Sequence, residues 1–217
     1  MGSLDTRDQI IYEAVRLFAE QGYEKTTIQA IIDAVGVSKG GFYHHFRSKD
    51  EIVEAITEAY IVEGLEYAEQ SVLQKDLSTA EKLNEFASVT QVYRKRRQDT
   101  REAIEQAFYG EHNLKLEKAI LTKMRDRTVP VLKGILAAGI ERGDLSIDDP
   151  DEYARILYQV LLHMKESLRD HLQAGADREK VASVLRTHED AICRMLSFPE
   201  SSLKLTPPYM KRLYEKE

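Results

Sequence analysis

The chain has 217 residues, 42% of them hydrophobic and 31% charged, which suits one small domain and one medium domain with a real core. Its formal net charge of −6 argues against unspecific coating of nucleic acid, although a local basic surface remains possible. The single cysteine, Cys193, excludes an intrachain disulfide framework, and neither a membrane span nor a signal peptide is visible, so we expect a cytoplasmic protein with no membrane contact.

The N-terminal segment predicts two helices. The first covers residues 5–20, with apolar side chains on one stripe, and Gly22 has the position of a C-cap glycine. The second covers residues 28–34, and either Thr26 or Thr27 is suited to cap it. Because helix N-termini favour anions, either hydroxyl could also contact a DNA phosphate.

A tight turn and a third helix follow. Gly36 supplies the backbone freedom that a sharp turn between helices needs, and Ser38 stands where an N-cap is wanted. The helix after it carries residues 39–46. Two short helices joined in this way are the sequence form of a helix-turn-helix, whose second helix enters the major groove of DNA.

The start of this third helix is unusual, because two adjacent glycines there each cost about 1 kcal/mol relative to alanine. Glycines are expected where a backbone must approach another surface closely. The surrounding side chains can reach phosphates, and no acidic residue lies between Lys39 and Lys49. The alternative is an ordinary surface helix with a flexible N-terminus. We predict that DNA is contacted by Thr27, Ser38, Lys39, Gly40, Gly41, Tyr43, His44 and Lys49.

A long helix is predicted next, from Lys49 to about Gln74. Ser48 followed three residues later by Glu51 is a capping-box pattern, and this box starts the helix. The helix joins the predicted DNA-binding segment to everything that follows. It is therefore the expected lever between the two parts.

Several motifs in this region occur together with uninterrupted spacing: Ala14–Phe18, Gly22-Tyr23, Thr26-Thr27, Gly36–Gly40, Phe42–Phe46 and Ser48-Lys49. With these motifs, residues 7–53 resemble the N-terminal DNA-binding domain of the TetR family of bacterial transcriptional regulators. The resemblance covers about a fifth of the chain. The remainder is similar to the family only in length and helical character.

The rest of the chain shows apolar spacings of three and four throughout, which predicts helices. The expected fold is all-α: an N-terminal three-helix helix-turn-helix domain in residues 1–48, a helical effector-binding and dimerisation domain in 49–197, and a C-terminal tail in 198–217 that is extended or ends in a short turn of helix. Pro130 should kink or split one long helix. Further helices are predicted at residues 79–97, 100–109, 113–142, 150–174 and 177–197.

The last two long helices have wide apolar stripes, so one side should pack on the domain and another should remain for a partner. Most soluble oligomers are two-fold dimers. The TetR resemblance implies that two helices from each subunit form a four-helix homodimer interface. Its predicted residues are Tyr153, Leu157, Val160, Leu161, Met164, Leu168, Val184, Leu185, His188 and Ile192.

A pocket for an unknown small-molecule effector is implied by the resemblance and by no motif. Tyrosines and methionines would suit an apolar, adaptable pocket with a few hydroxyl donors. The alternative is that each side chain belongs to an ordinary core. The candidates are Tyr60, Tyr67, Phe86, Tyr93, Phe108, Met124 and Tyr158.

No pattern supports catalysis, a cofactor or a metal site. His44 and His45 are adjacent on a helix and point about 100° apart, so they cannot chelate one ion together. The remaining histidines show no paired spacing of four along the chain. The basic run Arg94–Arg97 is either a second nucleic-acid site or, in our interpretation, a solvated helix end.

The sequence therefore predicts a dimeric, ligand-responsive transcriptional regulator that is not an enzyme. We expect a repressor that binds a palindromic double-stranded DNA operator and is released by a small molecule. The alternative from another class is a helical small-molecule-binding protein or enzyme with a vestigial DNA-binding head. A regulator without a small-molecule effector is a third option.

Overall fold

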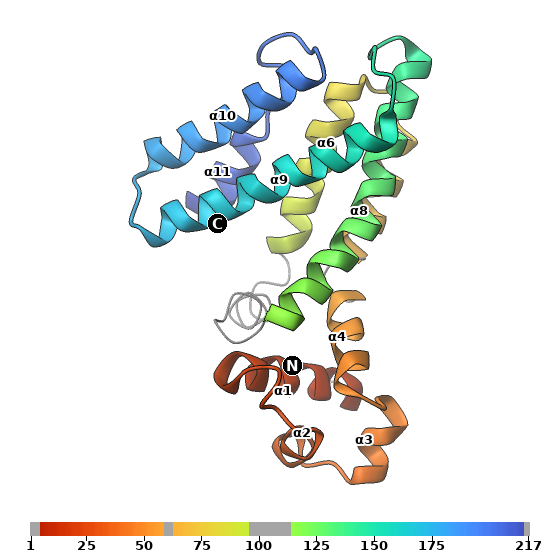
Figure 1. Cartoon of the computed structure of the whole chain (residues 1–217), viewed down its shortest axis with the longest axis vertical. Helices are drawn as coiled ribbons and strands as arrows, with labels where there is room; N and C mark the ends of the chain where they lie inside the picture. Colours follow the sequence, from red (N-terminus) through yellow and green to blue (C-terminus); the bar gives the residue numbers. More distant parts are fainter. Residues whose placement is uncertain (1–4, 59–62, 96–113, 215–217) are drawn as a thin grey trace. The chain divides into compact units, whose positions relative to one another are not determined.

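The computed structural model describes residues 5–58, 63–95 and 114–214, and within these ranges it contains helices and no strand (Figure 1). The predicted all-α fold is confirmed. The described helices are α1 (Thr6–Gln21), α2 (Ile28–Val35), α3 (Lys39–His45), α4 (Lys49–Thr57), α5 (Glu63–Leu73), α6 (Thr79–Lys95), α8 (Leu114–Arg142), α9 (Pro150–Gln173), α10 (Arg178–Met195) and α11 (Thr206–Tyr214).

The chain divides into two compact units, which are described separately below. The N-terminal unit comprises residues 1–63 and 96–124, and the C-terminal unit comprises residues 64–95 and 125–217. The predicted boundary at residue 48 differs from this division, because α4 belongs to the N-terminal unit. The predicted helix at 100–109 and the run Arg94–Arg97 lie wholly or partly outside the described residues.

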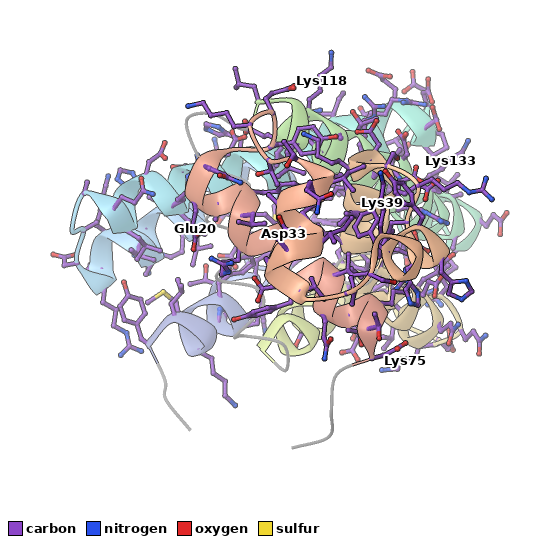
Figure 2. All side chains as sticks on the ribbon, turned by 90° about the horizontal axis from the view of Figure 1, so that it is seen from below. Glu20, Asp33, Lys39, Lys75, Lys118 and Lys133 are labelled. Carbon is purple, nitrogen blue, oxygen red and sulfur yellow. The ribbon has the colours of Figure 1, made fainter. Side chains whose placement is uncertain are left out.

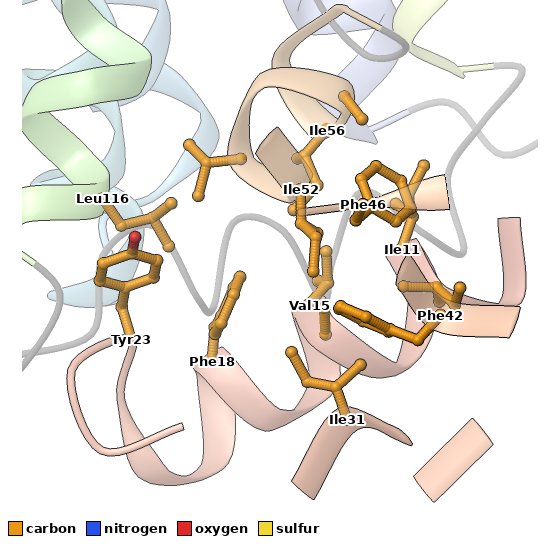
Figure 3. Close-up of a cluster of buried hydrophobic side chains, with 14 of the residues drawn as sticks. Ile11, Val15, Phe18, Tyr23, Ile31, Phe42, Phe46, Ile52, Ile56 and Leu116 are labelled. Atoms are coloured by element: carbon orange, nitrogen blue, oxygen red, sulfur yellow. The ribbon is translucent and has the colours of Figure 1, made fainter. Parts of the chain in front are cut away.

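The core of the N-terminal unit explains why α4 belongs to it. Buried side chains of α1, α2 and α3 form one hydrophobic cluster, which α4 completes with Ile52 and Ile56 (Figure 3). Leu116 and Ile120, from the first turns of α8, are also buried in this cluster. Apolar positions spaced by three and four therefore hold the three N-terminal helices against a fourth and a fifth.

The predicted helix from Lys49 to Gln74 is described as two elements, α4 and α5, and residues 59–62 between them lie outside the described residues. By contrast, α8 runs as one helix through Pro130. The split that proline could have caused is therefore absent, and Pro130 is exposed.

The C-terminal unit is built on a pair of long helices, α9 and α10, which pack against each other. Asp149 caps α9 by accepting hydrogen bonds from Asp151 N and Glu152 N, and Asp177 caps α10 through Lys180 N. Side-chain caps of this kind satisfy backbone donors that a helix start leaves unpaired.

A close approach of α8 to the start of α6 fixes another part of this unit. A Cβ built on Gly139 would lie 2.1 Å from Thr79 Oγ1, so only glycine fits there. The Asp144 carboxylate accepts hydrogen bonds from Thr79 N at 3.0 Å and from Thr79 Oγ1 at 3.3 Å. Because Gly139 has no side chain, the start of α6 can lie close enough to α8 for Thr79 to donate hydrogen bonds to Asp144.

The C-terminal segment 198–217 contains more structure than the predicted extended tail with a short turn of helix at its end. It carries α11, which packs on α6 and α10, and it buries Leu203, Leu205 and Tyr209. Asn84 of α6 donates to Ser202 O at 2.9 Å and accepts from Lys204 N at 2.6 Å. The scattered charges and three prolines of this segment did not indicate a helix that packs on the rest of the unit.

Candidate nucleic-acid interface

The turn chemistry of the predicted helix-turn-helix is present in the structure. Thr27 caps α2 by accepting a hydrogen bond from Ala30 N at 3.0 Å. Thr26 is buried and instead donates to Gly22 O at 2.8 Å, so its hydroxyl does not face outward. Gly36 ends α2 with a φ of 75°, in the left-handed region that favours glycine.

The helix α3 separates an inward side from an outward side. Phe42 is 0% exposed and packs in the core with Phe46, which follows the helix. Tyr43 is 44% exposed, and Lys39 and His44 are exposed too. Seven residues are too few to bury much, and one inward phenylalanine leaves most of the helix surface for a partner. The outward side contains Lys39, labelled in Figure 2.

The two glycines of α3 differ in what the fold requires of them. A Cβ on Gly41 would lie 3.2 Å from Ser38 Oγ, the atom that caps α3 by accepting from Gly41 N at 3.0 Å. A Cβ on Gly40 would meet only that same Oγ, at 4.0 Å, and the backbone there is not left-handed. The fold therefore tolerates alanine at position 40, where glycine costs stability.

Lys49 has a partner within the chain. Its Nζ donates to Tyr23 O at 2.6 Å and to Glu24 O at 3.4 Å, and it lies 4.3 Å from the centroid of the Tyr23 ring. The Tyr23 hydroxyl donates to Asp50, and burial together with this carboxylate raises the pKa of Tyr23 well above its ordinary value. These contacts fasten the α1–α2 turn to the start of α4.

The acidic residue Glu51, which follows α3, is engaged in the capping box. Ser48 Oγ accepts from Glu51 N at 3.2 Å, and Glu51 Oε2 accepts from Arg47 N at 2.7 Å. Asp33 on α2 is exposed and accepts from Gln29 Nε2 at 2.8 Å (Figure 2).

Two contributors to this surface were missing from the predicted set. Arg47 is exposed and adds a cation beside α3, and its place in the acid-free stretch could have identified it. The Tyr23–Asp50 pair joins residues 27 positions apart, and no local pattern signals such a contact.

The predicted dimer residues occupy two environments. Tyr153, Val160, Leu161 and His188 are half-buried and retain exposed surface. The other six are buried within their own chain, and their place at a dimer interface stays a prediction: Leu157, Met164, Leu168, Val184, Leu185 and Ile192. Because the apolar stripes of α9 and α10 are wide, the sequence does not show which of their residues pack inside the same chain.

The predicted pocket residues are not brought together by the described part of the structure. Phe86 and Tyr158 are buried in the C-terminal unit, and burial raises the pKa of Tyr158 to about 12. Met124 packs instead on the hydrophobic cluster of the N-terminal unit. Of the remaining candidates, Tyr60 and Phe108 lie outside the described residues, and so do the side chains of Tyr67 and Tyr93.

The sequence and the fold are similar to those of known proteins. A family model described as bacterial regulatory proteins, tetR family, matches residues 10–56. The HTH-type transcriptional repressor Rv1474c of Mycobacterium tuberculosis is 26% identical over 192 residues, which are 87% of this chain and 93% of that protein. A TetR family transcriptional regulator from Thermus thermophilus, PfmR, is 27% identical with a TM-score of 0.56, covering 91% of this chain and 99% of that one.

Residues 10–56 of the chain are a TetR-family DNA-binding region. The HTH-type transcriptional regulator TcmR of Streptomyces glaucescens is 48% identical over 60 residues, which are 26% of this chain and 26% of that protein. The surface around α3 is thus a TetR-type helix-turn-helix. None of the described helices is long and apolar enough to cross a membrane.

Proposed function

We propose that this TetR-family protein is a transcriptional repressor that binds a palindromic DNA operator as a homodimer and releases it when a small molecule binds the C-terminal unit. The observation that carries the DNA-binding part is the outward side of α3. It exposes Lys39, Tyr43 and His44, and Gly40 stands beside them where the fold does not need a glycine. In this proposal the Gly40 backbone lies against the groove wall, and the side chains contact base edges and phosphates.

The proposed dimer rests on the composition of the outer side of α9. Residues 153, 156, 160, 163 and 167 recur every three or four positions, share one face of that helix and include no charged residue. On this face Ile156 is 42% exposed, and Tyr153 and Val160 are half-buried. An uncharged exposed stripe on a long helix suits a self-complementary, two-fold interface.

A dimer would present two α3 helices to successive major grooves about 34–36 Å apart. A small molecule could then release DNA only if it binds better to a form with a different spacing, since equal affinity for both forms shifts nothing. Buried Phe86 and Tyr158 are the described aromatics that support an effector site in the C-terminal unit.

The test is DNA binding by the purified protein, measured as fluorescence anisotropy on fragments from upstream of its own gene across a series of salt concentrations. Lys39→Ala should weaken binding to the protein's operator more than binding to unrelated DNA. It should also reduce the salt slope by about 0.9 for each phosphate that the lysine neutralises. Lys118→Ala changes another exposed lysine, on α8, and as the matched control it should change neither quantity. Equal behaviour of the two variants would remove α3 from the interface.

The role of Lys49 is tested separately, because its ammonium already binds Tyr23 O. A direct phosphate contact predicts that Lys49→Ala weakens binding to all DNA sequences about equally and flattens the salt dependence. A role in holding the α1–α2 turn predicts weaker binding with the wild-type salt slope. An unchanged slope would therefore exclude the phosphate contact that the sequence suggested.

A further inference from the structure

Two histidines that are far apart in the sequence meet on the face proposed for the dimer. His163 of α9 and His188 of α10 have ring centroids 5.5 Å apart, with the ring planes inclined by 47°. His163 is exposed and His188 is half-buried. Sequence spacing could not show this pair, because its members come from different helices.

The orientation of His188 suits a metal ligand. Its Nδ1 lies 2.8 Å from Val184 O. Because a carbonyl oxygen can only accept, Nδ1 carries the proton, and the neutral ring keeps its lone pair on Nε2. Metal-binding histidines are commonly held in this way, with the second ring nitrogen donating to a backbone carbonyl.

The spacing of the rings agrees with a shared ion. For a tetrahedral zinc ion bound at about 2.0–2.1 Å, each imidazole centroid lies about 3.2 Å from the ion, so that two centroids are about 5.2 Å apart. The observed 5.5 Å is close to this value. Stacked rings would instead be nearly parallel, and the 47° inclination excludes that arrangement.

One chain supplies only half of such a site. Within the described residues, no group of three or more histidines, cysteines, aspartates or glutamates lies close enough to hold an ion. Two-fold symmetry can complete the set, since side chains close to the axis meet their own copies. His163 stands within the uncharged stripe of α9, and His188 is followed on its own helix by the uncharged residues Ala191, which is exposed, and Met195, which is half-buried.

We propose that the homodimer binds one divalent transition ion, of the zinc kind, between its subunits through His163 and His188 of both chains. This site rests on the dimer of the proposed function and adds a metal requirement that the family likeness does not carry. Four neutral imidazoles provide a tetrahedral nitrogen set that suits zinc. The ion would link the two chains and strengthen their association.

The experiment uses the full chain freed of metal with a chelator and then dialysed against zinc chloride. Bound zinc is measured per chain, and the dimer dissociation constant is measured by sedimentation with and without zinc. We expect one ion per two chains and a dissociation constant lowered at least about tenfold, which corresponds to about 1.4 kcal/mol. Cobalt in place of zinc should give the visible absorption of a tetrahedral site.

His163→Gln and His188→Gln should each abolish the bound ion and the zinc-dependent gain in association. His171→Gln changes another histidine of α9 and should preserve both. No bound zinc, one ion per chain, or equal loss in the His171 variant would overturn the proposal. Dimerisation and operator binding measured in chelator report on the proposed function independently, so failure of the metal site leaves that function standing.

Discussion

The two units of this protein differ in the sequence range of the hydrogen bonds that stabilise each of them internally. In the N-terminal unit, Thr27, Ser38 and Ser48 each cap a helix by bonding a backbone N–H three residues ahead. In the C-terminal unit, Asn84 fastens a segment 118 and 120 positions away. Local contacts thus form the turns of the DNA-binding unit, although its core also takes Leu116 and Ile120 from α8. The attachment of the C-terminal segment to α6 instead depends on residues that are far apart in the sequence.

The largest expected effect on stability distinguishes two adjacent residues of α3, one facing inward and one facing outward. Phe42→Ala removes a fully buried ring, so we expect a loss of about 3–5 kcal/mol and unfolding of the N-terminal unit. Tyr43→Ala removes an exposed ring and should cost less than about 1 kcal/mol, yet weaken DNA binding. Thermal unfolding followed by circular dichroism, with DNA anisotropy at room temperature, measures both. Similar stability losses in the two variants would contradict the inward and outward assignment.

A second pair of variants tests the close approach within the C-terminal unit. Gly139→Ala places a methyl group against Thr79 Oγ1, and we expect about 1–3 kcal/mol of destabilisation in urea unfolding. Gly134→Ala, on the same helix, meets Leu73 only at 3.7 Å and should stabilise by about 0.5–1 kcal/mol. Opposite signs are the expected result. A stabilising effect at both positions would mean that α8 and α6 do not approach as described.

A third variant tests the long-range attachment of the C-terminal segment. Asn84→Ala removes both of its hydrogen bonds to that segment and should cost about 1–2 kcal/mol. Hydrogen exchange should then rise in α11 and remain unchanged in α3. Ser202→Ala removes only a local bond to Pro199 O and is the control. Uniform faster exchange along the whole chain would argue against a locally attached segment.

A small effect on stability is expected at Gly40. Gly40→Ala should stabilise folding by about 0.5–1 kcal/mol, because the added methyl group enters open space on a helix. Operator affinity should nevertheless fall about tenfold if the backbone there lies against DNA. Unchanged affinity with increased stability would leave this glycine without a role in recognition.

Sequence reasoning succeeded where structure depends on nearby residues. Gly36, Ser38 and Ser48 carry the turn and caps that their types and positions predicted, and the ends of α9 and α10 lie within two residues of the expected ones. These features rely on backbone groups within one turn of the helix, so the local sequence contains the needed information.

The missed features all join residues distant along the chain. The Tyr23–Asp50 contact, the packing of α11 and the His163–His188 pair each require knowledge of how helices pack. For the same reason the sequence does not show which positions of the α9 and α10 stripes are buried within the chain. Apolar periodicity shows that a helix has a face to bury, but it does not identify the neighbour that covers each edge.

The helix α3 has one buried side chain, Phe42, among its seven residues. Its outward positions can therefore be exchanged during evolution with little penalty for folding. A duplicated gene could acquire a new DNA target by changing Lys39, Tyr43 or His44 while the core stayed the same. In the proposed interface, the residues that would select the operator differ from the residues that keep the domain folded, so each set is free to vary without the other.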